Sequence, residues 1–488
     1  MGVKARVLPG FLDRVLEREV PNGGTVVDLM SGTGVVAAHC AGRFRVFAND
    51  VQAYAGVIAR SFVGHEPRGR EAFFASLDFE CDLQSAYEQN LGALEVLYAP
   101  ALEVEAQLLA RFRGGDDGES WCEEYRDFLA RSDAVYAGGA PVAVGEERPE
   151  RDSPYRGARQ LLGEASLERY RADPDLRPAC LVTAYYANIY FGLRQCLVID
   201  SLRAAIESLL PGVSATGVPE GPPGPDLAKK AHYLSALLHA ASTATSSTSH
   251  FAQPRHLNKD TELRAMAIRR GVDIRASFEE FSAGIAAHVQ ATSYVGGNQC
   301  LVGDYSNLID DQGAFRFSAP VDLVYLDPPY TQDNYSRFYH VLEVLTTYDY
   351  PPLERNAAGA VLRGRYPVID RRFRSNFCRR AKVEGEFRRV ARAAAAVGAK
   401  LVVSYSSPTG LLLREYARQD PKCEPVRRFE ELCGEFYGDV STERRAMTHS
   451  GQGDSNLRIE ELLVVCREPK SGGAVAGSAA VSVTPVPG

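Results

Sequence analysis

The chain has 488 residues, of which 45% are hydrophobic and 24% charged, and its 55 lysines and arginines against 62 acidic residues leave a net charge of −7. The apolar fraction is that of folded proteins and argues against disorder for most of the chain. No apolar run approaches the roughly 20 residues of a membrane helix, and the ten cysteines include no CxxC pair. We therefore expect a cytoplasmic protein with reduced thiols, no metal site and no membrane contact. The acidic average, taken alone, points away from nucleic acid.

The first 65 residues predict the opening of a doubly wound α/β sheet. After a turn signal at Pro21-Asn22-Gly23-Gly24, the short apolar run over 25–29 suits a buried parallel strand. The tight loop Ser31-Gly32-Thr33-Gly34 follows, and the chain then predicts a helix over 35–41, a strand over 45–48 ending at Asn49-Asp50, and a helix over 54–62. Strand, glycine loop, helix, strand and acid in this order are typical of that fold.

The middle of the chain, residues 66–295, predicts a long and mainly helical insertion. Apolar residues at helical spacing indicate a helix over 189–209, and a second helix is expected over 227–241. The segment 114–124 is acidic and broken by glycines, and 212–225 (GVSATGVPEGPPGP) is a clear linker. We find no internal repeat.

Strands and helices alternate again from residue 299. Strands are predicted over 299–302, 321–326, 400–404 and 459–466, with helices starting near 336 and spanning 384–397. The simplest interpretation is one catalytic α/β domain formed by residues 1–65 and 296–467, interrupted by the insertion 66–295. The Gly-, Ala- and Pro-rich tail, residues 468–488, is expected to be disordered.

The glycine loop and the acid after the second strand indicate an adenosine-containing cofactor. Small residues let the backbone turn sharply and approach a ligand, while the following helix offers unpaired N–H groups. Asp50 lies 22 residues after Asp28, where a carboxylate can accept both hydroxyls of a ribose. The pattern Gly32-x-Gly34-x-x-Ala37 also satisfies a dinucleotide fingerprint, and a structural turn with a capping aspartate remains an alternative at this point.

Asp327-Pro328-Pro329-Tyr330 follows the strand over 321–326, at the carboxyl end where α/β sheets bind ligands. The two prolines fix the backbone and remove N–H donors, so that carbonyl groups can face a ligand. The exocyclic amino group of adenine is a poor nucleophile, because its lone pair is delocalised into the ring. A carboxylate and a fixed carbonyl can accept its two protons and localise that lone pair, while an aromatic ring stacks on the base. The alternative is a Pro-rich strand exit with a capping aspartate.

Together, DLMSGTG at 28–34, AND at 48–50 and LDPPY at 326–330 resemble the S-adenosylmethionine-dependent DNA adenine-N6 methyltransferases of the Dam-like group, in that group's order of motifs. The resemblance covers residues 1–65 and 299–410 and implies a Rossmann-like methyltransferase sheet with helices on both faces. It implies S-adenosyl-L-methionine as cofactor, held by Asp28, Ser31, Gly32, Gly34, Asp50, Asp304 and Tyr305. It implies catalysis at Asp327, Pro328, Pro329 and Tyr330, flanked by the strand over 404–407.

The resemblance implies double-stranded DNA as substrate and direct methyl transfer to an adenine rotated out of the duplex, without a metal. We expect a restriction-modification or phage-defence role, with a cognate restriction endonuclease or defence-system proteins as partners. An RNA adenine methyltransferase of the same fold and a non-catalytic DNA-binding specificity subunit are the alternatives. A protein-glutamine enzyme would usually have Asn at position 327, and a dinucleotide oxidoreductase leaves residues 327–330 unexplained.

One segment contradicts the acidic average. Residues 363–392 hold eleven basic residues and three acidic ones, a local balance of +8 that leaves −15 for the rest of the chain. Their place just after the catalytic loop suits phosphate contact. The residues predicted to bind DNA are Arg371, Arg372, Arg374, Arg379 and Arg380, together with Arg255 in the polar loop 249–256, the candidate for target recognition.

Overall fold

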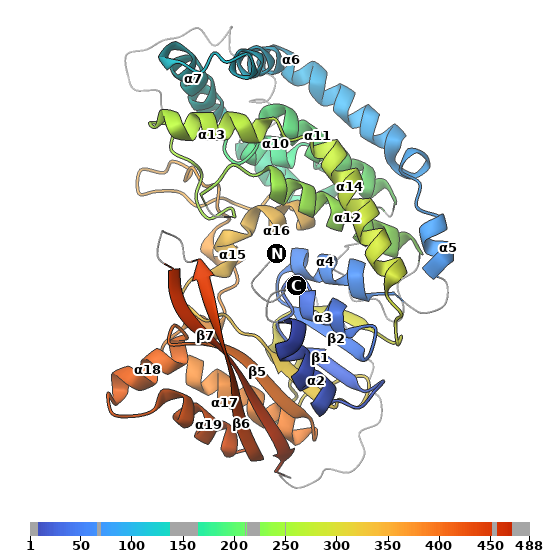
Figure 1. The fold of residues 1–488 in the computed structure, drawn as a ribbon. Helices are drawn as coiled ribbons and strands as arrows, with labels where there is room; N and C mark the ends of the chain where they lie inside the picture. The colour runs from blue at the N-terminus through green and yellow to red at the C-terminus, as the bar shows by residue number, and fades with distance from the viewer. Residues whose placement is uncertain are drawn as a thin grey trace.

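A computed structural model describes residues 8–65, 70–136, 164–209, 211, 225–248, 250–450 and 456–470, and a seven-stranded sheet forms its lower half (Figure 1). The strands stand in the order β3-β2-β1-β4-β5-β7-β6. They are β1 (Thr25–Asp28), β2 (Arg45–Asp50), β3 (Gln299–Val302), β4 (Leu323–Leu326), β5 (Lys400–Ser407), β6 (Tyr437–Ser450) and β7 (Asn456–Pro469). The first five in this order are parallel, and β7 runs antiparallel to both β5 and β6. This architecture confirms the predicted Rossmann-like α/β class.

Alternate residues of the central strands enter two separate cores, one on each face of the sheet. In β4, Leu323 and Tyr325 belong to the first core and Val324 and Leu326 to the second, all fully buried. Side chains alternate between faces with a period of two along a strand, so a strand buried on both faces has to be apolar at every position. This explains the apolar runs within these strands, at 26–27 in β1, 323–326 in β4 and 401–403 in β5.

Helices supply the other half of each core. On the first face lie the helical turn η1 (Leu8–Leu12) and helices α2 (Asp13–Glu19), α3 (Val35–Cys40) and α4 (Ala53–Val63). On the second face lie α17 (Val383–Ala396), α18 (Leu411–Gln419) and α19 (Pro425–Gly434). The chain extends the sheet from β1 to β3 in one direction and from β4 to β5 in the other, so the strand order reverses between β1 and β4. The carboxyl ends of strands at such a point are where open α/β sheets bind ligands.

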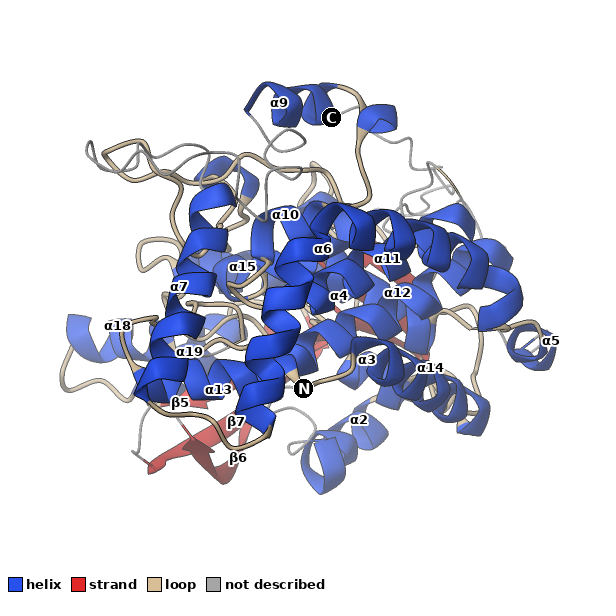
Figure 2. Cartoon of the chain, turned by 90° about the horizontal axis from the view of Figure 1, so that it is seen from above, coloured by secondary structure: helices blue, strands red, loops and turns tan. Residues whose placement is uncertain are grey.

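Between α4 and β3 the chain forms a layer of helices that lies over the sheet when the molecule is seen from above (Figure 2). Its elements are α5 (Arg70–Ala75), η2 (Glu80–Gln84), α6 (Ser85–Arg113), α7 (Glu119–Tyr136), α9 (Glu164–Ala172), η4 (Pro174–Leu176), α10 (Leu181–Tyr186), α11 (Leu193–Leu209), α12 (Pro225–Ala244), α13 (Asp260–Arg270) and α14 (Ile274–Ala291). Helix α12 packs on α4, where the hydroxyl of Ser61 donates to that of Ser235 at 2.9 Å. The helices therefore continue the core of the first face.

The predicted helices over 189–209 and 227–241 correspond to α11 and α12, although α11 begins only at Leu193. Most of the predicted linker 212–225 and of the predicted tail 468–488 lies outside the described residues. None of the helices in the described ranges has the length and hydropathy needed to cross a membrane.

Candidate active site at the carboxyl edge of the sheet

The loop that follows β1 turns sharply and lies against the end of β2. Its Ser31 N–H donates to the carbonyl of Asn49 at 2.8 Å, and Gly32 and Gly34 have φ angles of 53° and 76°, which favour glycine. A Cβ added at Gly34 would lie 2.8 Å from the Cβ of Ala59 in α4, whereas one added at Gly32 would meet nothing within 4 Å. Gly34 thus permits close packing of loop and helix, and Gly32 leaves open space above the loop.

Asp50, at the end of β2, holds the tip of this loop. Its carboxylate accepts the N–H of Gly32 at 2.9 Å and that of Gln52 at 2.8 Å. Burial raises the pKa of the Asp50 carboxyl above its ordinary value, and the hydrogen bonds from the backbone oppose that shift. Asp28, the last residue of β1, is 1% exposed. The acid and the glycine loop are therefore adjacent, as the sequence predicts.

Asn49 is a site residue to which the sequence motifs assign no role. Its side-chain amide donates to the carbonyls of Leu29 at 3.1 Å and Gly303 at 3.2 Å, and it is 3% exposed. It therefore ties the loop after β1 to the segment after β3. The signal in the sequence was its place directly before Asp50, at the carboxyl end of a strand.

The two predicted residues after β3, Asp304 and Tyr305, have different roles in the structure. The carboxylate of Asp304 caps the short helix η5 (Tyr305–Leu308) by accepting the N–H of Ser306 at 2.9 Å. The ring of Tyr305 is 5% exposed in the core of the second face, and its hydroxyl donates to Glu386 of α17. Asp304 thus lies at the edge of the site, whereas the side chain of Tyr305 points into the core.

Asp327 and Tyr330 lie together where the chain leaves β4. The hydroxyl of Tyr330 donates to Oδ1 of Asp327 at 2.7 Å, and its ring stands edge-on to Tyr405 of β5, with centroids 5.5 Å apart. The carbonyl of Tyr330 accepts the N–H of Leu411, which holds the loop against the start of α18. Burial and the neighbouring Asp327 raise the pKa of the Tyr330 hydroxyl well above its ordinary value, so it stays protonated and donates.

A buried carboxylate on β7 extends this group of side chains. Ser404 of β5 donates to Glu461, which is 2% exposed, and Ser404 also lies within hydrogen-bonding reach of Tyr330. Glu461 is paired with Ser406 in the antiparallel ladder of β5 and β7. Because this contact depends on strand register, no local sequence pattern indicates Glu461.

The polar loop expected to recognise the target lies beside the catalytic loop. The N–H of Phe251 donates to the carbonyl of Phe338 in α15 (Tyr335–Phe338) at 2.9 Å, and the rings of His250 and Tyr339 are 4.8 Å apart. Arg255 is half-buried and pairs with Glu262 at 2.5 Å. The structure therefore brings the loop to the site but engages Arg255 in an internal ion pair.

The second half of the basic segment, residues 376–392, packs on the second face of the sheet. Its turn η7 (Asn376–Cys378) is anchored by Phe377, which packs on Phe387, and by the Asn376 amide, which donates to Glu386 at 3.2 Å. The exposed arginines are Arg371, Arg374, Arg379 and Arg380. Arg371 and Arg380 pair with Asp349 at 3.9 Å and Glu415 at 3.3 Å but stay exposed. The side chain of Arg372 is only 9% exposed and pairs with Glu354 at 2.5 Å, which suits a structural role.

A carboxylate that sequence reasoning missed caps α4 beside Asp50. Glu343 of α16 (His340–Thr347) accepts the N–H groups of Ala53 at 3.0 Å and Tyr54 at 3.2 Å. Burial is the largest cause that raises the pKa of Glu343 to about 7, and the charge of Asp50 adds to it. A negative charge at a helix N-terminus is favourable, and the two N–H bonds partly oppose this rise.

Comparison with known proteins finds one family model that matches part of this edge. Residues 303–360 match the family model of the D12 class N6 adenine-specific DNA methyltransferases. The matched segment contains Asp304 and the whole of residues 327–330, and the match confirms the resemblance predicted from the sequence. No curated protein and no solved structure matches the chain significantly.

Proposed function

We propose that the protein transfers a methyl group from S-adenosyl-L-methionine to the N6 amino group of adenine in a specific sequence of duplex DNA. The observation that carries the proposal is the position of Asp327 and Tyr330 beside the glycine loop, within the segment that matches the D12 class. β1 and β4 are neighbours, and the N–H of Leu29 donates to the carbonyl of Tyr325 at 3.0 Å. Both motifs therefore lie side by side at the carboxyl edge of the sheet.

The residues around the glycine loop fit an adenosine-containing cofactor. Gly32 leaves open space where a ligand can approach the backbone, and Asp50 offers a carboxylate beside it. The groups proposed to hold S-adenosyl-L-methionine are Asp28, Ser31, Gly32, Gly34, Asp50 and Asp304, with Asn49 holding the loop in place. When bound, this cofactor supplies an electrophilic methyl group on a sulfonium centre.

The side chains of the catalytic loop would prepare the adenine. Asp327 and the carbonyl of Pro328 would accept the two N–H protons of the amino group and so localise its lone pair. Tyr330 would stack on the base, and in the structure its hydroxyl already holds Asp327 in position. Catalysis would come from orientation and from electrostatic complementarity, with no covalent enzyme intermediate.

An adenine amino group can be reached only when the base leaves the stack, so the proposal includes base flipping. Arg371, Arg374, Arg379 and Arg380 are exposed beside the catalytic loop and would contact phosphates, while the loop over 250–256 would contact the bases. We further propose a cytoplasmic enzyme of restriction-modification or phage defence, with a cognate endonuclease or defence-system proteins as partners.

The direct test is methyl transfer by the purified full chain from methyl-labelled S-adenosyl-L-methionine to unmethylated duplex DNA and to RNA of the same sequence, followed by nucleoside analysis. The expected product is labelled N6-methyldeoxyadenosine from the duplex. Label found only in RNA would contradict the proposal and identify the protein as an RNA adenine methyltransferase. Binding of both DNA and cofactor without any transfer would indicate a non-catalytic specificity subunit.

A further inference from the structure

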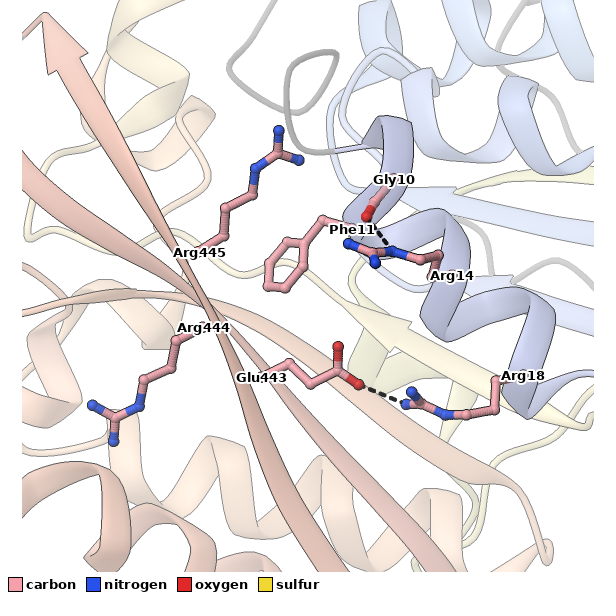
Figure 3. A pocket seen from close by; sticks show the side chains of 7 residues that line it. All are labelled: Gly10, Phe11, Arg14, Arg18, Glu443, Arg444 and Arg445. Atoms are coloured by element: carbon pink, nitrogen blue, oxygen red, sulfur yellow. Dashed lines mark hydrogen bonds and ion pairs between the residues drawn. The ribbon is translucent and has the colours of Figure 1, made fainter.

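A surface cleft of about 530 Å³ lies between the N-terminal helices and the edge strand β6 (Figure 3). Four arginines and a single acid line it, with Gly10 and Phe11 at its base; the charged residues are Arg14, Arg18, Glu443, Arg444 and Arg445. We call this surface the arginine cleft. Its lining carries an excess of three positive charges, in a chain whose net charge is −7.

The arginines of the cleft differ in what they contact. Arg18 donates to Glu443 and to Glu19, so its charge is compensated within the protein. Arg14 and Arg445 lie on either side of Phe11, with the guanidinium of Arg445 6.0 Å from the ring centre (Figure 3). The side chain of Arg444 points away from β6 in the direction opposite to that of Arg445, as expected for neighbouring residues of a strand (Figure 3). Arg14 and Arg445 are both exposed, and Arg14 also donates to the carbonyl of Gly10 (Figure 3).

Strand register places the arginine cleft level with the carboxyl end of β5, beside the candidate active site. Arg445 is paired with Glu461 of β7, and Glu461 is paired with Ser406 of β5. Neighbouring strands lie roughly 4.8 Å apart, so the backbone of Arg445 is about 10 Å from that of Ser406. Ser406 is next to last in β5, at the edge where Tyr330 packs against Tyr405.

The arginine cleft and the second half of the basic segment, residues 376–392, lie on opposite faces of the sheet. Phe11 belongs to the core of the first face, together with α2 and α4, whereas Phe377 of the basic segment belongs to the core of the second face. Two surfaces that carry exposed arginines thus flank the catalytic loop from its two sides. A single polyanion that crosses the carboxyl edge of the sheet would contact both.

We propose that the arginine cleft, through Arg14 and Arg445, binds backbone phosphates of the substrate duplex on the side of the flipped adenine opposite to the basic segment. The inference rests on the proposed function and adds to it a second phosphate-binding surface. Phosphate contacts position a protein on DNA without reading its sequence, and each one that is lost lowers the slope of log K against log salt by about 0.9.

The test measures binding of a fluorescein-labelled, mixed-sequence DNA duplex to the full chain over a series of KCl concentrations. For the double variant Arg14→Gln/Arg445→Gln we expect a loss of affinity of about tenfold or more at low salt and a salt slope lower by about 2. The variant Arg14→Lys/Arg445→Lys keeps both charges and should retain the wild-type slope. Affinity for S-adenosylhomocysteine should be unchanged in both variants.

The variant Arg427→Gln is the matched control, because Arg427 is exposed on α19 and pairs only with Glu431 among the residues described. It should leave the affinity and the salt slope unchanged. If the double glutamine variant melts like the wild type and binds the duplex with the same slope, the inference is overturned and the arginines serve to protect an edge strand. A wild-type chain that binds no duplex would instead overturn the proposed function.

Discussion

The backbone N–H of Gly32 donates to Oδ2 of Asp50 at 2.9 Å, although the two residues are separated by 18 positions in the chain. This bond joins the tip of the loop after β1 to the end of β2, and it places a carboxylate beside the open space above Gly32. We therefore assign two functions to the acid. It fixes the shape of the loop, and it would contact the ribose of the cofactor.

Asp50→Ala should weaken cofactor binding without unfolding the protein. Hydrogen bonds to a charged group contribute about 1.5–3 kcal/mol, so the dissociation constant of S-adenosyl-L-methionine should rise about ten- to a hundredfold. Isothermal titration calorimetry measures this directly. Asp311→Ala, which removes an exposed acid outside the site, is the control. An unchanged dissociation constant in Asp50→Ala would show that the cofactor does not bind at this loop.

Glu461→Gln should slow methyl transfer while it leaves cofactor affinity unchanged. The carboxylate holds Ser404, which lies next to Tyr330, and a glutamine presents an N–H₂ group where the serine hydroxyl now donates. A misplaced Tyr330 should lower kcat by about tenfold, with little change in KM. Glu460→Gln is the matched control, because Glu460 is exposed and contacts Arg444 at 3.6 Å. Equal kcat values for the two variants would exclude a positioning role for Glu461.

Protonation of Glu19 in acid should lower the free energy of unfolding of the protein. Burial alone would raise the pKa of Glu19, but hydrogen bonds from Arg467, Arg18 and Lys400 outweigh burial and lower it to about 2. A carboxyl with a lowered pKa contributes stability above its unfolded pKa near 4.5 and loses that stability as the pH falls towards 2. Glu19→Gln should therefore cost about 3 kcal/mol at pH 7.

Urea denaturation at pH 7 and at pH 3 measures this contribution. The difference between wild type and Glu19→Gln should shrink at the lower pH. The matched control is Glu17→Gln, since Glu17 is exposed and its surface pair with Arg43 should contribute under about 1 kcal/mol. A difference between wild type and Glu19→Gln that does not change with pH would contradict the assignment.

Glu343 should have the opposite pH dependence. Its pKa is raised to about 7, so the folded chain binds a proton that the unfolded chain releases near pH 4.5, and stability falls as the pH rises from 4.5 to 7. Buried histidines such as His232, whose pKa is lowered to about 4, act in the other direction over the same range. The informative quantity is therefore the difference in unfolding free energy between wild type and Glu343→Gln. The unfolding free energy of the wild type minus that of Glu343→Gln should decrease as the pH rises from 4.5 to 7. A difference that stays constant over this range would contradict the prediction.

The elements that the sequence predicts best are those whose signals are local. The strand over 299–302 coincides with β3, and the loops at 31–34 and 327–330 lie at strand ends, because glycine, proline and aspartate restrict the backbone within a few residues. Strand β6 was missed because it is an edge strand with a charged centre, Glu443–Arg445, and it exists only through its pairing with β7. The start of α7 at Glu119 was also not predicted, because it lies within the acidic, glycine-broken segment 114–124.

The parts of the site that depend on tertiary contacts could not be predicted. Arg372 is close in sequence to exposed arginines, yet its side chain is largely buried against Glu354. Likewise, Glu461 gained its place beside Ser404 from the register of β5 and β7, and Glu343 reached α4 from a helix almost 300 residues away. Sequence patterns identify which residue types can perform the chemistry, whereas packing decides which of them reach the site.

The proposed function depends above all on Asp327, which would prepare an adenine for methylation. To test this role, wild type and Asp327→Ala are expressed in a host without adenine methylases, and the host DNA is read by modification-sensitive sequencing. The wild type should leave N6-methyladenine within one sequence motif, and Asp327→Ala should leave none while still binding S-adenosylhomocysteine with wild-type affinity. Methylation of the same motif by Asp327→Ala at the wild-type level would contradict the proposed mechanism.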